Sequence, residues 1–161
     1  MSFERVKAFL SALGMADRAL SFDVSSATVP LAAKAVGVEE ARIAKTLSFR
    51  GPEGGALLVV TAGDTRIDNR AFKAHFGFKA RMLSAEEAVE ATGHAVGGVC
   101  PFDLKEDVAV YLDESLKRFD TIYPACGSAN SAVRLSPEEL QTLSGGEWVS
   151  VCRVREEKTE G

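Results

Sequence analysis

The segment RIAKTLSF, residues 42–49, places a lysine where an apolar side chain is expected. Alternate side chains of an extended strand project to the same face, so Lys45 shares its face with three apolar residues: Ile43, Leu47 and Phe49. A fully desolvated and unpaired ammonium is costly, so something must compensate its charge. Lys45 either reaches water or a carboxylate, or lines a cleft and contacts a phosphate, carboxylate or polarised carbonyl of a ligand. The strand pattern alone leaves both alternatives open.

The glycine-rich segment GHAVGGVCPF, residues 93–102, is a second place where chemistry could occur. Gly97 and Gly98 allow backbone conformations that other residues avoid, and they let a ligand approach main-chain N–H groups. Such a loop can form an oxyanion hole, but a tight Gly/Pro turn without a ligand explains the same residues. Cys100 could act as a thiol nucleophile only with a nearby base or a lowered thiol pKa, and His94 is the local histidine.

A third candidate is the segment ACGSANS, residues 125–131. Gly127, Ser128 and Asn130 could close over a ligand through backbone and amide hydrogen bonds. Alternatively, the Asn and Ser side chains bond their own backbone in an ordinary turn. This segment alone does not separate a binding loop from a turn.

Two adjacent acidic residues, Asp113 and Glu114, follow an apolar strand and could be interpreted as an acid–base pair. Neighbouring strand residues face opposite sides of a sheet, so these carboxylates are poorly placed to share a site. We expect a solvated strand end here.

The composition is that of an ordinary globular chain: 161 residues, 46% hydrophobic and 26% charged, with a net charge of −4. No overall basic field attracts nucleic acid, so any RNA contact must be local. No apolar run approaches the roughly 18 residues of a membrane span, and the amphipathic start is unlike a signal peptide, so we expect a cytoplasmic protein that does not bind membranes. The cysteines and histidines lack the spacing of a zinc site, so we expect reduced thiols, no structural metal and no cofactor.

Hydrophobic periodicity, capping residues and glycine stops predict helices and strands interspersed along one domain, residues 1–155, with a polar tail at 156–161. The run Leu57 to Val60 is apolar at every position and predicts an interior strand covered on both faces. The irregular order favours a mixed α+β domain (α/β in the broad sense), with a mixed, partly barrel-like sheet flanked by helices. The expected helices span residues 2–13, 27–38, 68–77, 84–93 and 136–145, and the expected strands 42–49, 55–63, 108–116, 131–136 and 147–154.

Four motifs, IAKTLSF, TGHAVGGVCPF, VYLDESL and GSANSAVRLSPEEL, together resemble the YbaK family, also called the prolyl-tRNA synthetase associated domain. The likeness covers nearly the whole chain, with the motifs in the family's order. It implies a mixed α/β fold and an editing hydrolase that removes amino acids wrongly esterified to tRNA.

By this resemblance, Lys45 matches the family's strand lysine, whose ammonium would meet the phosphate or ester end of the aminoacyl-adenosine. Thr46 matches a small polar position near the substrate, although it faces the other side of the strand. The matching glycine-rich loop, whose N–H groups surround the ester carbonyl, consists of Gly97, Gly98, Val99, Cys100 and Pro101. The loop across the pocket comprises Gly127, Ser128 and Asn130.

The resemblance also implies that a ribose hydroxyl of the terminal adenosine positions or activates water, so that no protein nucleophile is required. Many relatives carry serine where this chain has Cys100, so we expect its thiol to be incidental. The wall residues Phe22, Val29 and Leu31 would set the substrate, because a methylene changes selectivity by only about 1 to 3 kcal/mol.

The favoured hypothesis is a deacylase for mischarged tRNA, with tRNA(Pro) carrying a small residue such as alanine as its substrate. Its partner would be the acceptor end of aminoacyl-tRNA, with prolyl-tRNA synthetase or an elongation factor as candidate helpers. Two alternatives remain at this stage. One is a non-catalytic module that binds a nucleotide or aminoacyl-tRNA as an adaptor, and the other is a thiol hydrolase that uses Cys100.

Overall fold

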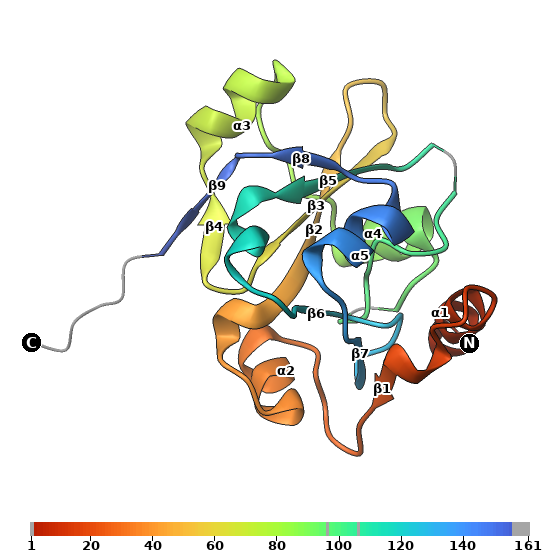
Figure 1. Cartoon of the computed structure of the whole chain (residues 1–161). Helices are drawn as coiled ribbons and strands as arrows, with labels where there is room; N and C mark the ends of the chain where they lie inside the picture. The colour runs from red at the N-terminus through yellow and green to blue at the C-terminus, as the bar shows by residue number, and fades with distance from the viewer. Residues whose placement is uncertain (1, 96, 106, 156–161) are drawn as a thin grey trace, which may run out of the picture.

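Five strands form a central mixed sheet in the order β6-β2-β3-β5-β8 (Figure 1). The computed structural model describes residues 2–95, 97–105 and 107–155, so the expected tail at 156–161 lies outside the described residues. Strands β2 and β3 are antiparallel, whereas β2/β6, β3/β5 and β5/β8 are parallel. The strands are β1 (Ala19–Ser21), β2 (Ile43–Arg50), β3 (Ala56–Ala62), β4 (Thr65–Ile67), β5 (Ala109–Asp113), β6 (Tyr123–Pro124), β7 (Ser131–Val133), β8 (Glu147–Val149) and β9 (Cys152–Val154).

The helices begin and end at residues that the sequence marks as caps and stops. Their bounds are α1 (Ser2–Ser11), α2 (Val29–Val36), α3 (Asn69–Phe76), α4 (Ala85–Thr92) and α5 (Pro137–Ser144). The predicted capping boxes of α4 and α5 are both present, at Ser84 with Glu87 and at Ser136 with Glu139. The mixed α+β class is therefore confirmed. Within the described residues, no helix is long and apolar enough to cross a membrane.

Strand β3 is the interior strand that its continuous apolar run predicts, because all seven of its residues are buried. Val60 and Ala62 belong to a core cluster that includes side chains of α1 and α5. Leu57 and Val59 belong to a second cluster built around Phe72 of α3. Figure 1 shows α3 and α1 on opposite sides of the sheet. Helices thus cover both faces, and this anchors β2 and β3 rigidly beside the site described below.

The strand expected at residues 147–154 is two strands that join different sheets. β8 pairs with β5, and β9 pairs with β4. Between them, Oδ1 of Asp113 accepts hydrogen bonds from the main-chain N–H groups of Val151 (2.9 Å) and Cys152 (3.0 Å). Its Oδ2 accepts a third from the N–H of Ser115 (3.0 Å). A buried carboxylate therefore replaces a neighbouring strand as the acceptor.

The expectation of a solvated strand end was wrong for Asp113, which is only 2% exposed. Glu114 lies on the surface and starts a 3-10 helix, Glu114–Arg118, where continued strand was expected. The sequence pattern did not reveal that Asp113 is buried, because two of its three N–H donors, Val151 and Cys152, are distant from it in the chain. Strands β1, β4 and β6 were also missed, since two or three residues are too few to show a period.

Candidate active site

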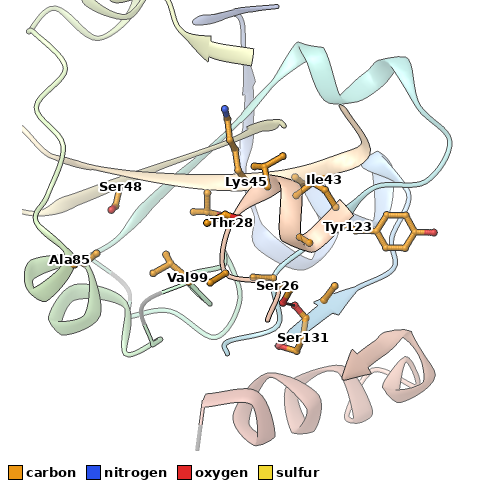
Figure 2. Close-up of a pocket in the computed structure, with 18 of the residues that line it drawn as sticks. Ser26, Thr28, Ile43, Lys45, Ser48, Ala85, Val99, Tyr123 and Ser131 are labelled. Carbon is orange, nitrogen blue, oxygen red and sulfur yellow. Dashed lines mark hydrogen bonds between the residues drawn. The ribbon is translucent and has the colours of Figure 1, made fainter. Parts of the chain in front are cut away.

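A pocket of about 290 Å³ lies along the outer edge of β2 (Figure 2). Its walls come from the start of α2, strand β2, the segment leading into α4, the glycine-rich loop and strands β6 and β7. The residues that line it are Ser26, Ala27, Thr28, Val29, Ala32, Ile43, Ala44, Lys45, Thr46, Ser48, Leu83, Ser84, Ala85, Ala88, Gly97, Val99, Tyr123, Ala125, Ser131 and Ala132. Most of them are small, so the cavity suits a small ligand group.

Neighbouring strand residues face opposite sides of a sheet, so Lys45 and Thr46 were not expected to share a site. Both nevertheless line this pocket, because it lies at the edge of β2 and both faces of the strand contribute to it. β6 pairs with β2 only at Ile43 and Ala44. Further along, the segment 81–83 covers the same edge, where the N–H of Leu83 donates to the carbonyl of Ser48 (2.9 Å). The pocket lies at the uncovered stretch between them. A ligand placed at this edge can therefore meet both Lys45 and Thr46.

Lys45 lies in the middle of β2, and its side chain is half-buried. In Figure 2 it rises on the opposite side of β2 from Val99 and Ser26. Its ammonium donates a hydrogen bond to the main-chain carbonyl of Thr65 in β4. Among the residues that the structure describes, it forms no ion pair with a carboxylate. The lysine lines the pocket with its stem, and a carbonyl holds its charged end.

Desolvation is the main cause that lowers the pKa of Lys45, and the nearby Arg155 guanidinium lowers it further. Cys152 and Asp64 act in the opposite direction. Asp64 is itself engaged in an ion pair with Arg118 (2.7 Å). A cation that is desolvated, has no carboxylate partner in the described part of the chain and flanks a pocket can be stabilised by an anionic ligand.

The hydroxyl of Thr46 is buried and has no hydrogen-bond partner among the described residues. Its main-chain N–H and C=O groups face the edge away from β3, as do those of Ser48 and Arg50, which bond the segment 81–83. At that edge they have no main-chain partner within residues 2–95, 97–105 and 107–155. Buried polar groups are nearly always paired, so an unpaired hydroxyl at a pocket wall indicates a position where water or a ligand binds. Thr46 is thus better placed for ligand contact than sequence reasoning suggested.

The glycine-rich loop contributes Gly97 and Val99 to the pocket, whereas Gly98, Cys100 and Pro101 are buried behind it. Gly97 has a φ of 80°, a left-handed conformation that favours glycine. A Cβ on Gly97 would lie 2.7 Å from the Cβ of Ala27, and one on Gly98 would overlap the backbone of Ser128. The glycines are therefore required for close packing of the loop. The N–H of Val99 has no main-chain partner in the described part of the chain.

Cys100 is fully buried, and burial raises the pKa of its thiol well above the ordinary value. Hydrogen bonding to the backbone of Phe102 and Gly127 lowers this pKa only in part. The thiol is therefore neutral near pH 7 and does not line the pocket, so it is poorly suited to act as a nucleophile.

The loop with Gly127, Ser128 and Asn130 supports the pocket from outside, since none of the three lines it. The Asn130 side-chain amide donates to the carbonyl of Phe22 (3.1 Å), and the Ser128 hydroxyl donates to the Asn130 carbonyl oxygen (2.9 Å). These contacts match the turn alternative, with local bonds and one bond across to the segment before α2. The next residue, Ser131, does line the pocket and is 2% exposed.

The N-terminus of α1 joins the two loops behind the pocket. The Ser2 hydroxyl lies 2.5 Å from Nδ1 of the buried His94, whose Nε2 lies 2.8 Å from the carbonyl of Phe102. A Cβ on Gly127 would lie 2.6 Å from the Ser2 hydroxyl oxygen. Ser2 therefore packs against the 127–131 loop and bonds the base of the glycine-rich loop at the same time.

The pKa of His94 is lowered, chiefly by burial and also by Arg5, whereas its bond to Phe102 and the nearby Asp103 raise it. Arg5 in turn bonds Asp103 (2.9 Å) and the carbonyl of Gly93 (3.3 Å). A neutral imidazole that donates from Nε2 and accepts at Nδ1 fits both contacts.

Of the three predicted wall residues, only Val29 lines the pocket. Leu31 is 42% exposed on α2, and Phe22 belongs to the segment that Asn130 anchors. The pocket residues that sequence reasoning missed include Ser26, Thr28, Ser48, Ala85 and Ala88. Ser48 could have been found, because it shares the small and polar face of β2 with Thr46. Ala85 and Ala88 are spaced by one helical turn. This spacing predicts a helix face of small residues, but it does not predict that the face lines a ligand pocket.

The chain is similar to several known proteins and to one family model. Residues 24–143 match the model of the aminoacyl-tRNA editing domain. The "Uncharacterized protein YwhH" of Bacillus subtilis is 51% identical over 154 residues, which is 95% of this chain and 98% of that protein. The "Putative Cys-tRNA(Pro)/Cys-tRNA(Cys) deacylase EbsC" of Enterococcus faecalis is 28% identical over 120 residues, or 74% of this chain and 73% of that protein.

A solved structure described as "a putative trans-editing enzyme for prolyl tRNA synthetase" has the same fold. It superimposes with a TM-score of 0.85 at 32% identity, and the match covers 94% of this chain and 97% of that one. The family match spans α2, β2, the glycine-rich loop and β7, which are the segments that build the pocket. The chain belongs to the aminoacyl-tRNA editing domain family, the YbaK family that its sequence motifs resemble.

Proposed function

We propose that this protein is an aminoacyl-tRNA deacylase that hydrolyses the ester of a mischarged tRNA in trans. The observation that carries the proposal is the small pocket at the edge of β2, within a chain of the aminoacyl-tRNA editing family. The substrate we favour is tRNA(Pro) carrying a small wrong amino acid such as alanine. Support for a small side chain comes from the alanine-rich wall, which includes Ala32, Ala85 and Ala88.

Lys45 is proposed to bind the phosphate or ester end of the terminal adenosine. Among the described residues its ammonium bonds the main-chain carbonyl of Thr65 and no carboxylate, and a ligand anion would be a stronger partner than that carbonyl. Because its stem already lines the pocket, a change of side-chain torsions rather than of the strand would bring the charge toward the ligand.

The hydrolysis itself requires water, the ester and stabilisation of negative charge. Water attacks the ester carbonyl, the C–O bond to the ribose breaks, and a proton passes to the ribose oxygen, which releases the free amino acid. Charge develops on the carbonyl oxygen during the attack, and the N–H of Val99 is a candidate donor to it. The neutral, buried Cys100 takes no part in this scheme.

The test is deacylation of tRNA(Pro) charged in turn with alanine, cysteine, serine, threonine and proline. We expect multiple turnover on one mischarged species and little on prolyl-tRNA(Pro). Lys45→Met keeps the apolar stem and removes the charge, so kcat/KM should fall about 100-fold or more. Cys100→Ser is the matched control inside the site's supporting loop, and it should retain activity within a few-fold.

Each other outcome has a defined meaning. Binding of aminoacyl-tRNA without hydrolysis of any species would contradict the proposal and favour the adaptor alternative. Loss of activity in Cys100→Ser with normal folding would point to the thiol hydrolase. Full activity in Lys45→Met would remove the lysine from the mechanism while leaving the deacylase assignment in place.

A further inference from the structure

The outer edge of β2 has a gap one residue wide in its hydrogen bonding. Even-numbered residues of β2 direct their main-chain groups to this edge, since Ser48 accepts from Leu83 and Arg50 donates to Arg81 (2.8 Å). Ala44 is paired with Pro124 of β6. Thr46 is the even-numbered residue between them, and its N–H and C=O have no partner among the described residues. The pocket lies at this residue.

An unpaired N–H and C=O on one strand residue can bind a ligand that carries one donor and one acceptor at matching positions. In an antiparallel sheet, two residues of a hydrogen-bonded pair exchange both bonds, so each C=O accepts from the other's N–H. A ligand that completes such a pair needs a donor and an acceptor separated by a single carbon atom. The α-amino group and the carbonyl of an aminoacyl ester have this arrangement, whereas a plain acyl ester offers only the acceptor.

We infer that the pocket selects α-aminoacyl esters by pairing them with the free edge of β2 at Thr46, as a neighbouring strand residue would pair. The Thr46 carbonyl accepts a hydrogen bond from the substrate's α-amino group, and the Thr46 N–H donates to the ester carbonyl. This inference rests on the proposed function and specifies the class of acyl group that the site takes. It assigns recognition to main-chain groups, which a substitution of the Thr46 side chain would not remove.

The same pairing explains where the substrate's side chain would lie. Side chains of directly opposed residues in an antiparallel pair project to the same face. The substrate's side chain would therefore lie beside that of Thr46, on the face that it shares with Ser48. Figure 2 shows Ser48 directed toward the start of α4 at Ala85, and Ala88 follows one turn later in the pocket wall. A small side chain fits there, but a bulky one would meet α4.

The test compares three acyl groups of equal size on the same tRNA(Pro): alanyl, lactyl and propionyl. Propionyl lacks the α-amino group, and lactyl replaces it with an uncharged hydroxyl donor. Because the α-ammonium also speeds spontaneous hydrolysis, each enzymatic rate is divided by the spontaneous rate of the same ester. We expect this rate enhancement to be about tenfold or more greater for alanyl than for propionyl, with lactyl between them.

A change in the protein's main chain gives an independent measurement. Replacing Thr46 by the corresponding α-hydroxy acid substitutes an oxygen for its N–H and leaves the side chain intact. That N–H has no partner in the described chain, so the only expected loss of stability is the small one from the weaker ester carbonyl of Lys45, which faces Thr61 of β3, while kcat/KM on alanyl-tRNA falls about tenfold. The matched control is the same replacement at Leu47, which is in register with Val59 of β3 and should lose stability.

The outcomes separate this inference from the proposed function. Equal rate enhancement for alanyl and propionyl, or unchanged kcat/KM in the Thr46 α-hydroxy acid variant, would overturn edge pairing while the deacylase assignment stands. No hydrolysis of any of the three esters above the spontaneous rate would overturn both.

Discussion

At the scale of single residues, Thr46 and Lys45 show how a ligand site differs from a folded core. A core position would pair the Thr46 hydroxyl and would not hold an ammonium against a lone carbonyl. Both residues are supported by a strand whose neighbour β3 is completely buried. The sheet thus holds an unpaired hydroxyl and a desolvated ammonium in place, although both lower the stability of the fold. Such destabilising groups are expected where side chains bind a ligand.

The unpaired hydroxyl of Thr46 should therefore affect stability and activity in opposite directions. Thr46→Val is nearly isosteric and removes a buried, unpaired hydroxyl, so the free energy of unfolding should rise by about 1 kcal/mol. If the hydroxyl binds substrate, kcat/KM should fall about tenfold in the same variant. Urea denaturation and the deacylation assay measure the two effects.

The control for this prediction is Thr46→Ser, which keeps the hydroxyl and should keep most of the activity. A Thr46→Val variant that gains stability and retains full activity would show that the hydroxyl contacts water rather than substrate.

At the scale of elements, short strands depend on acceptors and donors supplied by other segments. β8 and β9 have three residues each, and the turn between them is held by the Asp113 carboxylate at the end of β5. The same residue starts the 3-10 helix by accepting from Ser115. One buried side chain therefore organises the junction of three elements.

Asp113→Ala should lower the free energy of unfolding by about 3 kcal/mol or more, because it leaves buried N–H donors without an acceptor. The adjacent Glu114→Ala is the matched control. Its side chain is exposed and forms an ion pair with the equally exposed Lys117, so its effect should stay within about 0.5 kcal/mol. Chemical denaturation of both variants checks this, and similar stabilities would refute the structural role of Asp113.

At the scale of the whole molecule, the start of α1 and the two pocket loops form one connected unit. Ser2 contacts His94 at the base of one loop and packs against Gly127 in the other. The opening helix α1 therefore supports the pocket from behind. The imidazole of His94 is the titratable group in this unit, with Arg5 and Asp103 as its charged neighbours.

The stability of the folded protein should depend on the protonation of His94. Its pKa in the folded protein lies below the ordinary value of 6.5 that it regains on unfolding. Between these two values the unfolded chain binds more protons, so the free energy of unfolding should fall as the pH decreases below 6.5. The slope should approach about 1.4 kcal/mol per pH unit until the folded pKa is reached.

Denaturation of the wild type and of His94→Asn across pH 5 to 7 tests this dependence. His75 remains in both proteins, so the difference in slope isolates His94. NMR titration of the wild type measures the same pKa directly, whether or not the variant folds. A midpoint at or above 6.5, or equal slopes in the two proteins, would contradict the prediction.

The sequence determined the secondary structure wherever a pattern repeats over a full turn or several strand residues. The helices and strands β2 and β3 follow from periodicity, caps and glycine stops, which act over short distances in the chain. The sequence also indicated Lys45 and the glycine-rich loop, because a charge on an apolar face and a Gly-Gly pair are unusual locally. Its motifs identified the family as well.

Which of these residues share one cavity depends on how the elements pack together, and a sequence pattern does not show this. The tertiary structure removed Leu31 and Asn130 from the pocket lining and added Ser48, Ala85 and Ser131, because packing between distant segments sets what faces a cavity. It also buried Asp113 and left Thr46 unpaired. Hydrogen bonding of a strand edge depends on where the neighbouring segments end, and that is fixed by contacts between residues far apart in the chain.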